Sequence, residues 1–187
     1  TIRSAAFESM CPGNAPSDML LDYHRSVAAG GIGMTTVAYA AVTRSGLSFD
    51  RQLWMRPEII PGLRRLTDAI HAEGAAAGIQ LGHCGNMSHK SICGCTPVGA
   101  SGGFNLYSPT FVRGLRADEL PEMARAYGRS VNLAREAGFD AVEIHAGHGY
   151  LISQFLSPST NHRKDEFGGS LQNRMRFMDM VMEEVMK

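Results

Sequence analysis

Apolar and polar positions follow two alternating periods along the chain. Mostly apolar runs rich in small and β-branched residues predict strands, at residues 1–8, 32–40, 76–83 and 139–145. Apolar residues that recur three and four positions apart predict amphipathic helices, at residues 18–29, 62–74, 117–137 and 171–187. The chain therefore reads as strand and helix in turn, repeated about four times.

Capping and stop residues support these boundaries. Ser17 and Ser170 are expected to cap the first and last helices, and Pro61 suits a first helical turn. Gly74 and Gly138 are natural ends for the second and third helices. The last helix carries a narrow apolar stripe, which predicts core packing, formed by Leu171, Met175, Met178, Met182 and Val185.

Strands that alternate with amphipathic helices indicate right-handed βαβ units and a parallel sheet. A closed (β/α)8 barrel needs eight such units and about 250 residues, whereas this chain has 187 residues and about four units. The pattern therefore predicts either the first half of a barrel or a small open sheet. A long glycine-rich segment, 84–116, interrupts the alternation, and loops of that length in a compact domain are usually functional.

The composition is that of a folded protein with balanced charge. Hydrophobic residues make up 44% of the chain, and 18 basic residues balance 18 acidic ones. Net charge therefore favours neither nucleic acid nor a membrane surface as a partner, and no apolar run is long enough to span a bilayer. The first residues lack the pattern of a signal peptide, so we expect a cytoplasmic protein.

Chemistry-bearing side chains gather where predicted strands end. His145 closes the fourth strand, and His148 and Tyr150 follow within five residues; His83 closes the third strand, with Gln80 three residues before it. In parallel α/β folds the carboxyl ends of strands form the site of chemistry. A single histidine is more often structural, but two histidines and a tyrosine this close favour a functional role.

These side chains have complementary chemistry. Histidine N–H groups can hold a carbonyl or phenolate oxygen, and a tyrosine, which is ordinarily protonated at neutral pH, can act as a general acid. Such a set suits the reduction of a polarised double bond, but it supplies no hydride. A redox cofactor would have to supply the hydride.

Residues 136–177 carry motifs that identify a family. They contain H-x-x-H-G-Y-L, then Q-F-L-S-P, then N-x-R-x-D-E-F-G-G-S-x-x-N-R; "GIQLGHCGN" at 78–86 and "AAGGIGMTTVAYAAV" at 28–42 are also similar to family strands. The chain resembles the old yellow enzyme family of flavin oxidoreductases, in the branch of the 2,4-dienoyl-CoA reductases and NADH:flavin oxidoreductases. The resemblance spans nearly the whole chain, but only the first half of the family's barrel.

The resemblance implies an FMN-binding TIM (β/α)8 barrel, of which residues 1–187 form the N-terminal half. His145 and His148 match the pair that holds the substrate oxygen, and Tyr150 matches the proton donor to the α-carbon. Gln80 matches a glutamine that contacts the polar edge of the flavin. Further flavin contacts correspond to Ala5, Ala6, Phe7 and Tyr39. Two departures are the Ala-Ala-Phe sequence itself and Asn86, which stands where the family usually has arginine.

The implied enzyme is an ene-reductase that passes hydride from NAD(P)H through FMN to an α,β-unsaturated carbonyl or thioester. The family's residues for the FMN phosphate belong to the second half of the barrel. An iron–sulfur cluster, present in some relatives, would also lie in that missing part. A half-barrel with unpaired edge strands implies a homo-oligomer, a complementing chain or the missing half.

Two alternatives stay open. The chain could be a truncated, non-catalytic half-barrel, or, less readily, a metal-dependent hydrolase that uses the strand-end histidines. The cysteine spacing matches no paired zinc motif and the glycines match no Rossmann motif, so free thiols and no metal are expected. A charged segment such as 162–169 is by default a solvated loop, but the resemblance implies an ordered loop in which Arg163 pairs with Asp165. Glu143, in a strand, is expected to point away from the histidines.

Overall fold

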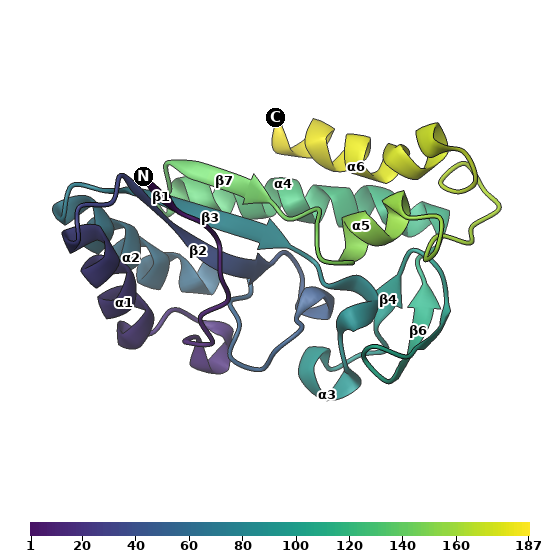
Figure 1. Cartoon of the computed structure of the whole chain (residues 1–187), viewed down its shortest axis with the longest axis horizontal. Coiled ribbons are helices and arrows are strands. Elements are labelled where there is room, and N and C mark those ends of the chain that lie inside the picture. The colour runs from purple at the N-terminus through teal and green to yellow at the C-terminus, as the bar shows by residue number, and fades with distance from the viewer. The chain divides into compact units, whose positions relative to one another are not determined.

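The computed structural model describes residues 1–187. The strands that alternate with the long helices form a four-stranded sheet. Its four strands lie in the order β1 (Ile2–Arg3), β2 (Met34–Ala41), β3 (Ala76–Gly82) and β7 (Ala141–Ile144) (Figure 1). β1 pairs parallel with β2, and β3 pairs parallel with β7, with Gln80 opposite Glu143. The predicted strand order and parallel pairing are confirmed.

Four long helices follow the strands, as predicted: α1 (Asp18–Ala29), α2 (Ile60–Ala72), α4 (Leu120–Glu136) and α6 (Leu171–Val185). Both predicted serine caps form, because Ser17 Oγ accepts from the Leu20 N–H at 3.1 Å and Ser170 Oγ from the Asn173 N–H at 3.2 Å. Two short helices, α3 (Lys90–Cys93) and α5 (Leu151–Leu156), were not predicted. One-turn 3-10 helices occur at Pro12–Asn14, Arg44–Gly46, Pro57–Ile59, Gly85–Met87 and Ala117–Glu119.

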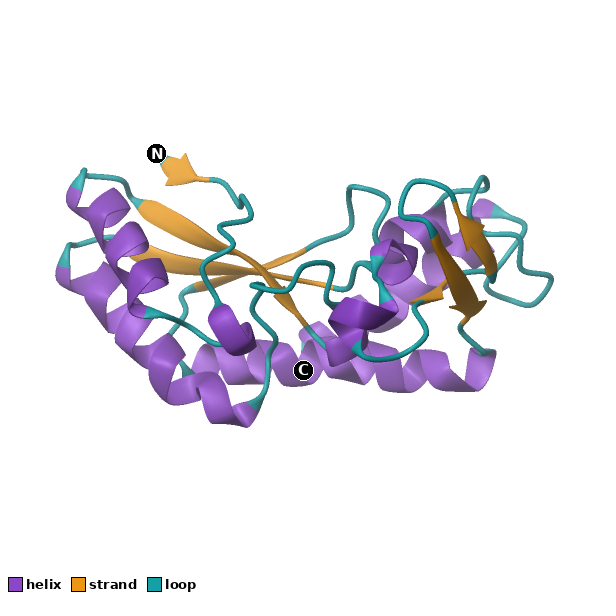
Figure 2. Cartoon of the chain, turned by 90° about the horizontal axis from the view of Figure 1, so that it is seen from below, coloured by secondary structure: helices purple, strands orange, loops and turns teal.

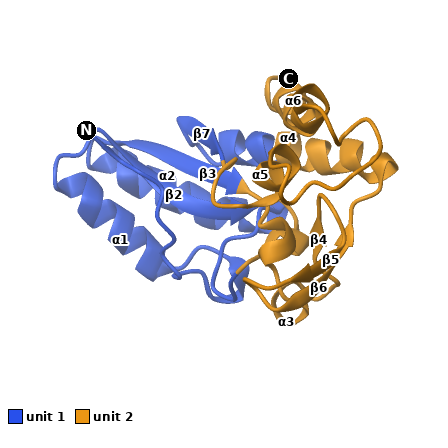
Figure 3. Ribbon diagram, turned by 45° about the vertical axis from the view of Figure 1, so that its right-hand side comes forward, with its two compact units in different colours: residues 1–41, 49–81, 130–144 blue, residues 42–48, 82–129, 145–187 orange.

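The chain divides into two compact units, coloured separately in Figure 3. Unit 1 comprises residues 1–41, 49–81 and 130–144; unit 2 comprises residues 42–48, 82–129 and 145–187. In unit 1, α1 packs on α2 and on β2, with the helices on one side of the strands (Figure 2). Its fully buried side chains include Leu20, Val37, Leu63, Leu66, Ile70 and Ile79, which are the predicted inner faces of the helices and strands.

The outer strands of the four-stranded sheet are β1 and β7, as expected for the first and fourth strands. Ile2 in β1 keeps 65% of its surface exposed, and Ala141, Val142 and Ile144 in β7 are half-buried. An outer strand presents unpaired backbone N–H and C=O groups. These two strands are therefore the positions at which further strands could join the sheet.

The long segment of residues 84–116 is ordered, and the prediction of a loop there is wrong. It contains α3 and a small sheet, β4 (Val98–Gly99), β5 (Gly103–Asn105) and β6 (Thr110–Gly114), in the order β4-β6-β5. The β4–β6 pairing is parallel and the β5–β6 pairing is antiparallel. The short pairings were missed because each strand has too few residues to show a period.

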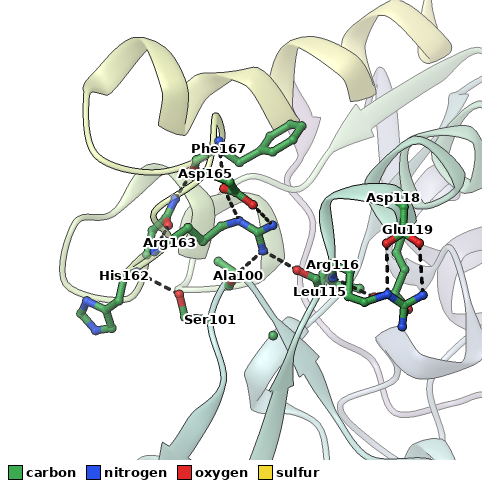
Figure 4. Close-up of polar contacts among 12 residues, drawn as sticks. Ala100, Ser101, Leu115, Arg116, Asp118, Glu119, His162, Arg163, Asp165 and Phe167 are labelled. Carbon is green, nitrogen blue, oxygen red and sulfur yellow. Dashed lines mark hydrogen bonds and ion pairs between the residues drawn. The ribbon is translucent and has the colours of Figure 1, made fainter.

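Arg163 fastens this small sheet within unit 2 (Figure 4). Its guanidinium donates to the carbonyl oxygens of Ala100, at 3.0 Å, and Leu115, and pairs with Asp165 at 2.6 Å. Arg163 also lowers the pKa of the Asp165 carboxyl, chiefly by hydrogen bonding to it. The predicted Arg163–Asp165 pair is confirmed, and its role is to hold residues 100 and 115.

Two further predictions about elements are wrong. The first strand ends at Arg3 and not at residue 8. The Glu8 side chain accepts hydrogen bonds from the Arg3 guanidinium at 3.2 Å and from the Ala38 N–H at 3.3 Å. In a longer strand, the Ala38 N–H of β2 would bond to a backbone carbonyl oxygen instead. The apolar stripe of α6 is not buried by residues 1–187. The helix is buried through Phe177, which packs on Phe155 of α5 at 4.6 Å, while the stripe positions Leu171, Met175 and Met182 are exposed.

None of the helices combines the length and the apolar character that crossing a membrane requires.

Candidate active site

The segment after β7 brings His145, His148 and Tyr150 together in unit 2. The ring centroids of His145 and Tyr150 are 4.9 Å apart, those of the two histidines are 4.9 Å apart, and those of His148 and Tyr150 are 6.3 Å apart. His145 is 7% exposed, Tyr150 is half-buried and His148 is exposed. The three predicted side chains therefore form one cluster that is open on the His148 side.

Hydrogen bonds order the protons of the two imidazoles. His145 Nδ1 accepts from the Gly147 N–H at 3.4 Å, and His145 Nε2 lies 3.1 Å from His148 Nδ1. A neutral His145 then carries its proton on Nε2 and donates to His148, whose own proton is on Nε2. In this arrangement the His148 Nε2–H is the donor directed outward from the pair.

The backbone of this loop is held in an unusual conformation. His148 has φ +55° and Gly149 has φ +69°, in the left-handed region that non-glycine residues rarely adopt. The side chain of Gln154, on α5, is 1% exposed, and its amide lies 2.7 Å from the Gly149 carbonyl oxygen and 3.1 Å from that of Cys84. Gln154 thus ties the loop after β7 to the segment after β3.

A cavity of about 530 Å³ lies within unit 2 and reaches the cluster at His148, while His145 and Tyr150 are not part of its lining. Its lining includes Asn86, Phe104, Tyr107, His148, Gly149 and His162. This volume is within the range of small-molecule sites. The small sheet of residues 98–114 supplies the aromatic wall, so the unpredicted part of the fold shapes the space next to His148.

Asn86, which stands where the family usually has arginine, belongs to the packing under this cavity. Its Oδ1 lies 2.9 Å from the Gln154 amide nitrogen, and its backbone carbonyl accepts from Asn105 at 2.7 Å. A neutral amide at this position therefore connects α5 with β5, and the site carries no positive charge from residue 86.

Gln80 and Glu143 meet on the other unit's sheet. They are register partners in β3 and β7, and Gln80 Nε2 donates to Glu143 Oε1 at 2.7 Å. Gln80 is 8% exposed and Glu143 is exposed. Side chains of register partners in a parallel pair lie on the same face, so Glu143 and Gln80 share one face of the sheet. The prediction that Glu143 points away from the histidines stays a prediction.

The remaining predicted cofactor residues also lie in unit 1. Ala5 is half-buried and Ala6 exposed, in irregular chain after β1 and not in a strand. Phe7 stacks on Phe49, with ring centroids 4.6 Å apart, and keeps 39% of its surface exposed. Tyr39 is 4% exposed near the end of β2, where its carbonyl oxygen accepts from Gln52 at 3.2 Å.

His83, expected beside the cluster at the strand ends, is buried and structural. It is 0% exposed; its Nδ1 accepts from the Gly85 N–H at 2.9 Å and its Nε2 lies 3.0 Å from Ser45 Oγ. Burial lowers the pKa of His83 to about 3, so the ring is neutral and donates to Ser45. A β-carbon added at Gly46 would lie 2.9 Å from this ring, which shows how closely the chain covers it.

No set of three or more His, Cys, Asp or Glu side chains in the chain is placed so that it could hold a metal ion.

The parallel strands and the helices between them are of the α/β-barrel class, and comparison with known proteins identifies the family. Residues 4–187 match the model of the NADH:flavin oxidoreductase / NADH oxidase family. The chain belongs to this family, that of the old yellow enzymes, as the sequence motifs predicted.

Curated relatives are longer than the chain. A 4,4'-dithiodibutanoate disulfide reductase of Rhodococcus erythropolis is 41% identical over 184 residues, which are 98% of this chain and 46% of the relative. An NADPH dehydrogenase of Listeria monocytogenes is 40% identical over 172 residues, which are 90% of this chain and 49% of the relative. The chain thus spans about half the length of these relatives.

Solved structures confirm the fold class. The old yellow enzyme homologue of Zymomonas mobilis has a TM-score of 0.92 and 28% identity, and the match covers 99% of this chain and 55% of that one. A morphinone reductase gives 0.92 and 27%, covering 99% and 54%. The chain therefore has the TIM-barrel fold of this family and carries about the first four βα units.

Two residues of this region were missed by sequence reasoning. From the sequence, Glu143 was named only as a residue that points away; its bond to Gln80 depends on the register between β3 and β7. Gln154 lies in the quoted Q-F-L-S-P motif, but its role was not visible there. Its amide contacts Cys84, which is 70 residues away in the sequence, and Gly149, which is five residues away.

Proposed function

We propose that the protein is an FMN-dependent, NAD(P)H-linked oxidoreductase of the ene-reductase type. The substrate is an α,β-unsaturated carbonyl compound or thioester. The observation that carries this proposal is the cluster of two imidazoles and a phenol, with ring centroids 4.9 to 6.3 Å apart, of which His148 lines a cavity of about 530 Å³. To reduce an activated alkene, the protein must supply hydrogen-bond donors to the substrate's carbonyl oxygen and a proton to its α-carbon.

His145 and His148 hold the substrate's carbonyl oxygen in this proposal. Negative charge develops on that oxygen as the double bond is reduced, and positioned N–H donors stabilise it. The outward Nε2–H of His148 is one such donor. The His145 Nε2–H becomes the second when it leaves His148 Nδ1, 3.1 Å away, and turns to the substrate oxygen.

Tyr150 supplies the proton. Its ring lies 4.9 Å from that of His145, so a carbonyl gripped by the histidines has its neighbouring carbon within reach of the phenol. Proton transfer from Tyr150 to the α-carbon completes the saturation of the bond. The half-buried position of Tyr150 keeps the hydroxyl close to substrate and partly shielded from water.

The residues of unit 1 fit a flavin. The Gln80–Glu143 bond uses one of the two amide hydrogens of Gln80, so the amide oxygen and the second N–H can pair with a heterocycle edge that offers both a donor and an acceptor. Backbone groups at Ala5, Ala6, Phe7 and Tyr39 provide further contacts. When bound, FMN reduced by NAD(P)H supplies the hydride that the β-carbon receives.

The proposal requires the rest of the barrel. Residues 1–187 form its N-terminal half, and the outer strands β1 and β7 are where the remaining strands pair. That second half contributes the phosphate end of the FMN site. It is supplied by further chain, or by a second chain that completes the barrel.

Tyr150→Phe tests the chemistry. In flavin-loaded protein we expect alkene reduction to slow by roughly 10²–10⁴-fold, the usual contribution of a general acid, while reduction of the flavin by NAD(P)H changes little. The two half-reactions are measured separately by stopped-flow absorbance with cyclohexenone as the probe. Tyr23→Phe, on α1 in unit 1, is the matched control and leaves both rates unchanged. Equal losses in both half-reactions would contradict the role of Tyr150.

The rival is a non-catalytic half-barrel. Titration of the protein with FMN, followed by flavin fluorescence, distinguishes the FMN-dependent enzyme from the non-catalytic half-barrel. Saturable binding that weakens in Gln80→Leu supports the enzyme. Binding that is absent both from the protein and from its mixture with a purified C-terminal barrel half supports the rival.

A further inference from the structure

Two thiols lie side by side in unit 2, away from the histidine cluster. Cys93 ends α3 and is 2% exposed, whereas Cys95 is exposed. Cys95 Sγ is 3.7 Å from Cys93 Sγ, and Cys93 Sγ is 3.2 Å from the Cys95 carbonyl oxygen. A disulfide S–S bond is about 2.05 Å long, so a side-chain rotation of the exposed Cys95 is the movement that bonding requires.

The backbone between the thiols is built for this approach. Gly94 has φ +77° and its N–H donates to the Lys90 carbonyl oxygen at 2.9 Å, which ends the helix and reverses the chain. A β-carbon at Gly94 would lie 3.1 Å from a guanidinium nitrogen of Arg44, so the arginine packs directly on the glycine. A Cys-Gly-Cys sequence with this turn returns the second thiol onto the first.

Cys95 also faces a second cavity, of about 570 Å³, within the same unit. Its lining includes Ser45, Cys95, Thr96, Val98, Arg113 and Met123. The pair thus combines a solvent-facing thiol at a small-molecule-sized cavity with a partner thiol sealed behind it. Cys11 and Cys84, the other two thiols, are both buried.

The surroundings of Cys95 affect the pKa of its thiol in opposite directions. Partial burial and the neighbouring Cys93 raise the pKa of the Cys95 thiol, while Arg44 and Arg113 oppose that rise. Since the thiolate is the attacking species, reaction at Cys95 gets faster as the pH rises through the alkaline range.

We infer that Cys93 and Cys95 form a thiol–disulfide exchange site for low-molecular-weight organic disulfides. Cys95 is the attacking thiol, because it is exposed and faces the cavity. Cys93 is the resolving thiol, because it is buried and adjacent. The site stands on these thiols alone and does not depend on the proposed flavin chemistry.

The reaction balances in two displacements. The Cys95 thiolate, having lost its proton to water, attacks one sulfur of R–S–S–R, which forms a Cys95–S–S–R bond and releases one RS⁻ that is protonated to RSH. The Cys93 thiolate, having lost its proton to water, then attacks Cys95 Sγ, which forms the Cys93–Cys95 bond, breaks the Cys95–S–S–R bond and releases a second RS⁻ that is protonated to RSH. The disulfide substrate is reduced by two electrons, the cysteine pair is oxidised by two, and an excess of small thiol reverses both steps.

The test uses reduced protein without FMN or nicotinamide and bis(2-hydroxyethyl) disulfide as the probe. We expect the native protein to lose the mass of two hydrogens, with peptide mapping showing a Cys93–Cys95 bond and no retained adduct. Cys93→Ser should keep one hydroxyethylthio group on Cys95, and Cys95→Ser should keep none. Cys11→Ser and Cys84→Ser are the matched controls and react as the native protein does.

The rate supplies a second measurement. Below the pKa of Cys95 it should rise close to tenfold per pH unit, because the thiolate fraction does. A stable adduct on Cys95 of the native protein, or no reaction at either thiol across that pH range, would overturn the inference. Either result would leave the flavin proposal intact, since cyclohexenone reduction involves neither thiol.

Discussion

The loops that follow β3 and β7 begin with a histidine each and make opposite use of it. His83 is fully buried, bonded through both ring nitrogens and held neutral with a pKa lowered to about 3. His145 also follows its strand directly, although the register that pairs Leu81 with Ile144 offsets it by one residue from His83. His145 is hydrogen-bonded to the exposed His148, which lines a cavity. A histidine that directly follows a strand is therefore structural in one case and a candidate binding residue in the other.

The difference lies in what packs above each ring. Residues 42–48 cover His83 so closely that Gly46 has no room for a β-carbon. After β7 the chain turns through two left-handed residues, His148 and Gly149, where a β-carbon on Gly149 meets nothing within 4 Å. The loop after β3 is covered by residues 42–48, whereas the loop after β7 is open at His148. Each of the following substitutions tests this difference.

The largest effect is expected from the open loop. His148→Ala should slow alkene reduction by roughly 10²–10³-fold, since one donor to the developing oxyanion is lost, and leave the free energy of unfolding within about 1 kcal/mol of the native value. His148→Asn, which keeps an N–H donor and tolerates a positive φ, should recover most of the rate. Single-turnover kinetics and urea denaturation measure the two quantities. A similar rate loss in both variants would mean that the donor is not what His148 contributes.

In the sealed loop, acid should act on stability through His83. An unfolded histidine takes up a proton near pH ~6.5, whereas folded His83 resists it down to about pH 3. The unfolded state therefore binds more protons in this window, and folding stability falls as the pH drops. We expect about 2 kcal/mol to be lost between roughly pH 7 and 5, measured as the difference between the native protein and His83→Gln. Parallel pH profiles for the two proteins would show that His83 is not the group responsible.

Gly46→Ala should destabilise the fold by about 1–3 kcal/mol, because the added methyl group meets the His83 ring at 2.9 Å and the core there has no free space. The midpoint of urea denaturation measures this. Alkene reduction per folded molecule should not change. An alanine tolerated without cost would show that residues 42–48 yield easily, and that the loop is less tightly sealed than its contacts indicate.

Gly149→Ala is the matched substitution in the open loop and should have the smallest effect on stability. It costs only the left-handed backbone penalty of roughly 1 kcal/mol, since nothing lies within 4 Å of the new atom. The same denaturation experiment compares the two alanines. If Gly149→Ala were the more damaging of the pair, the contrast between the loops would be reversed.

The sequence by itself determined the order of strands and helices and most of their boundaries. Helix 18–29, its Ser17 cap and the parallel order of the strands all followed from the spacing of apolar residues and from capping residues. His145, His148 and Tyr150 were predictable as a cluster because they lie within six residues, where local chain geometry alone keeps side chains close. The family motifs were equally visible for the same reason.

Only the tertiary structure decided what depends on contacts between distant segments. The burial of His83 under residues 42–48, the Gln80–Glu143 bond across 63 residues and the small sheet held by Arg163 all join parts of the chain that no short period connects. The exposed methionine face of α6 was misread because periodicity shows that a helix has an apolar side, but not which side its neighbours cover. The periodicity of apolar residues depends on the stability of single helices and strands. Which of their side chains are exposed to water depends on how those elements pack against one another.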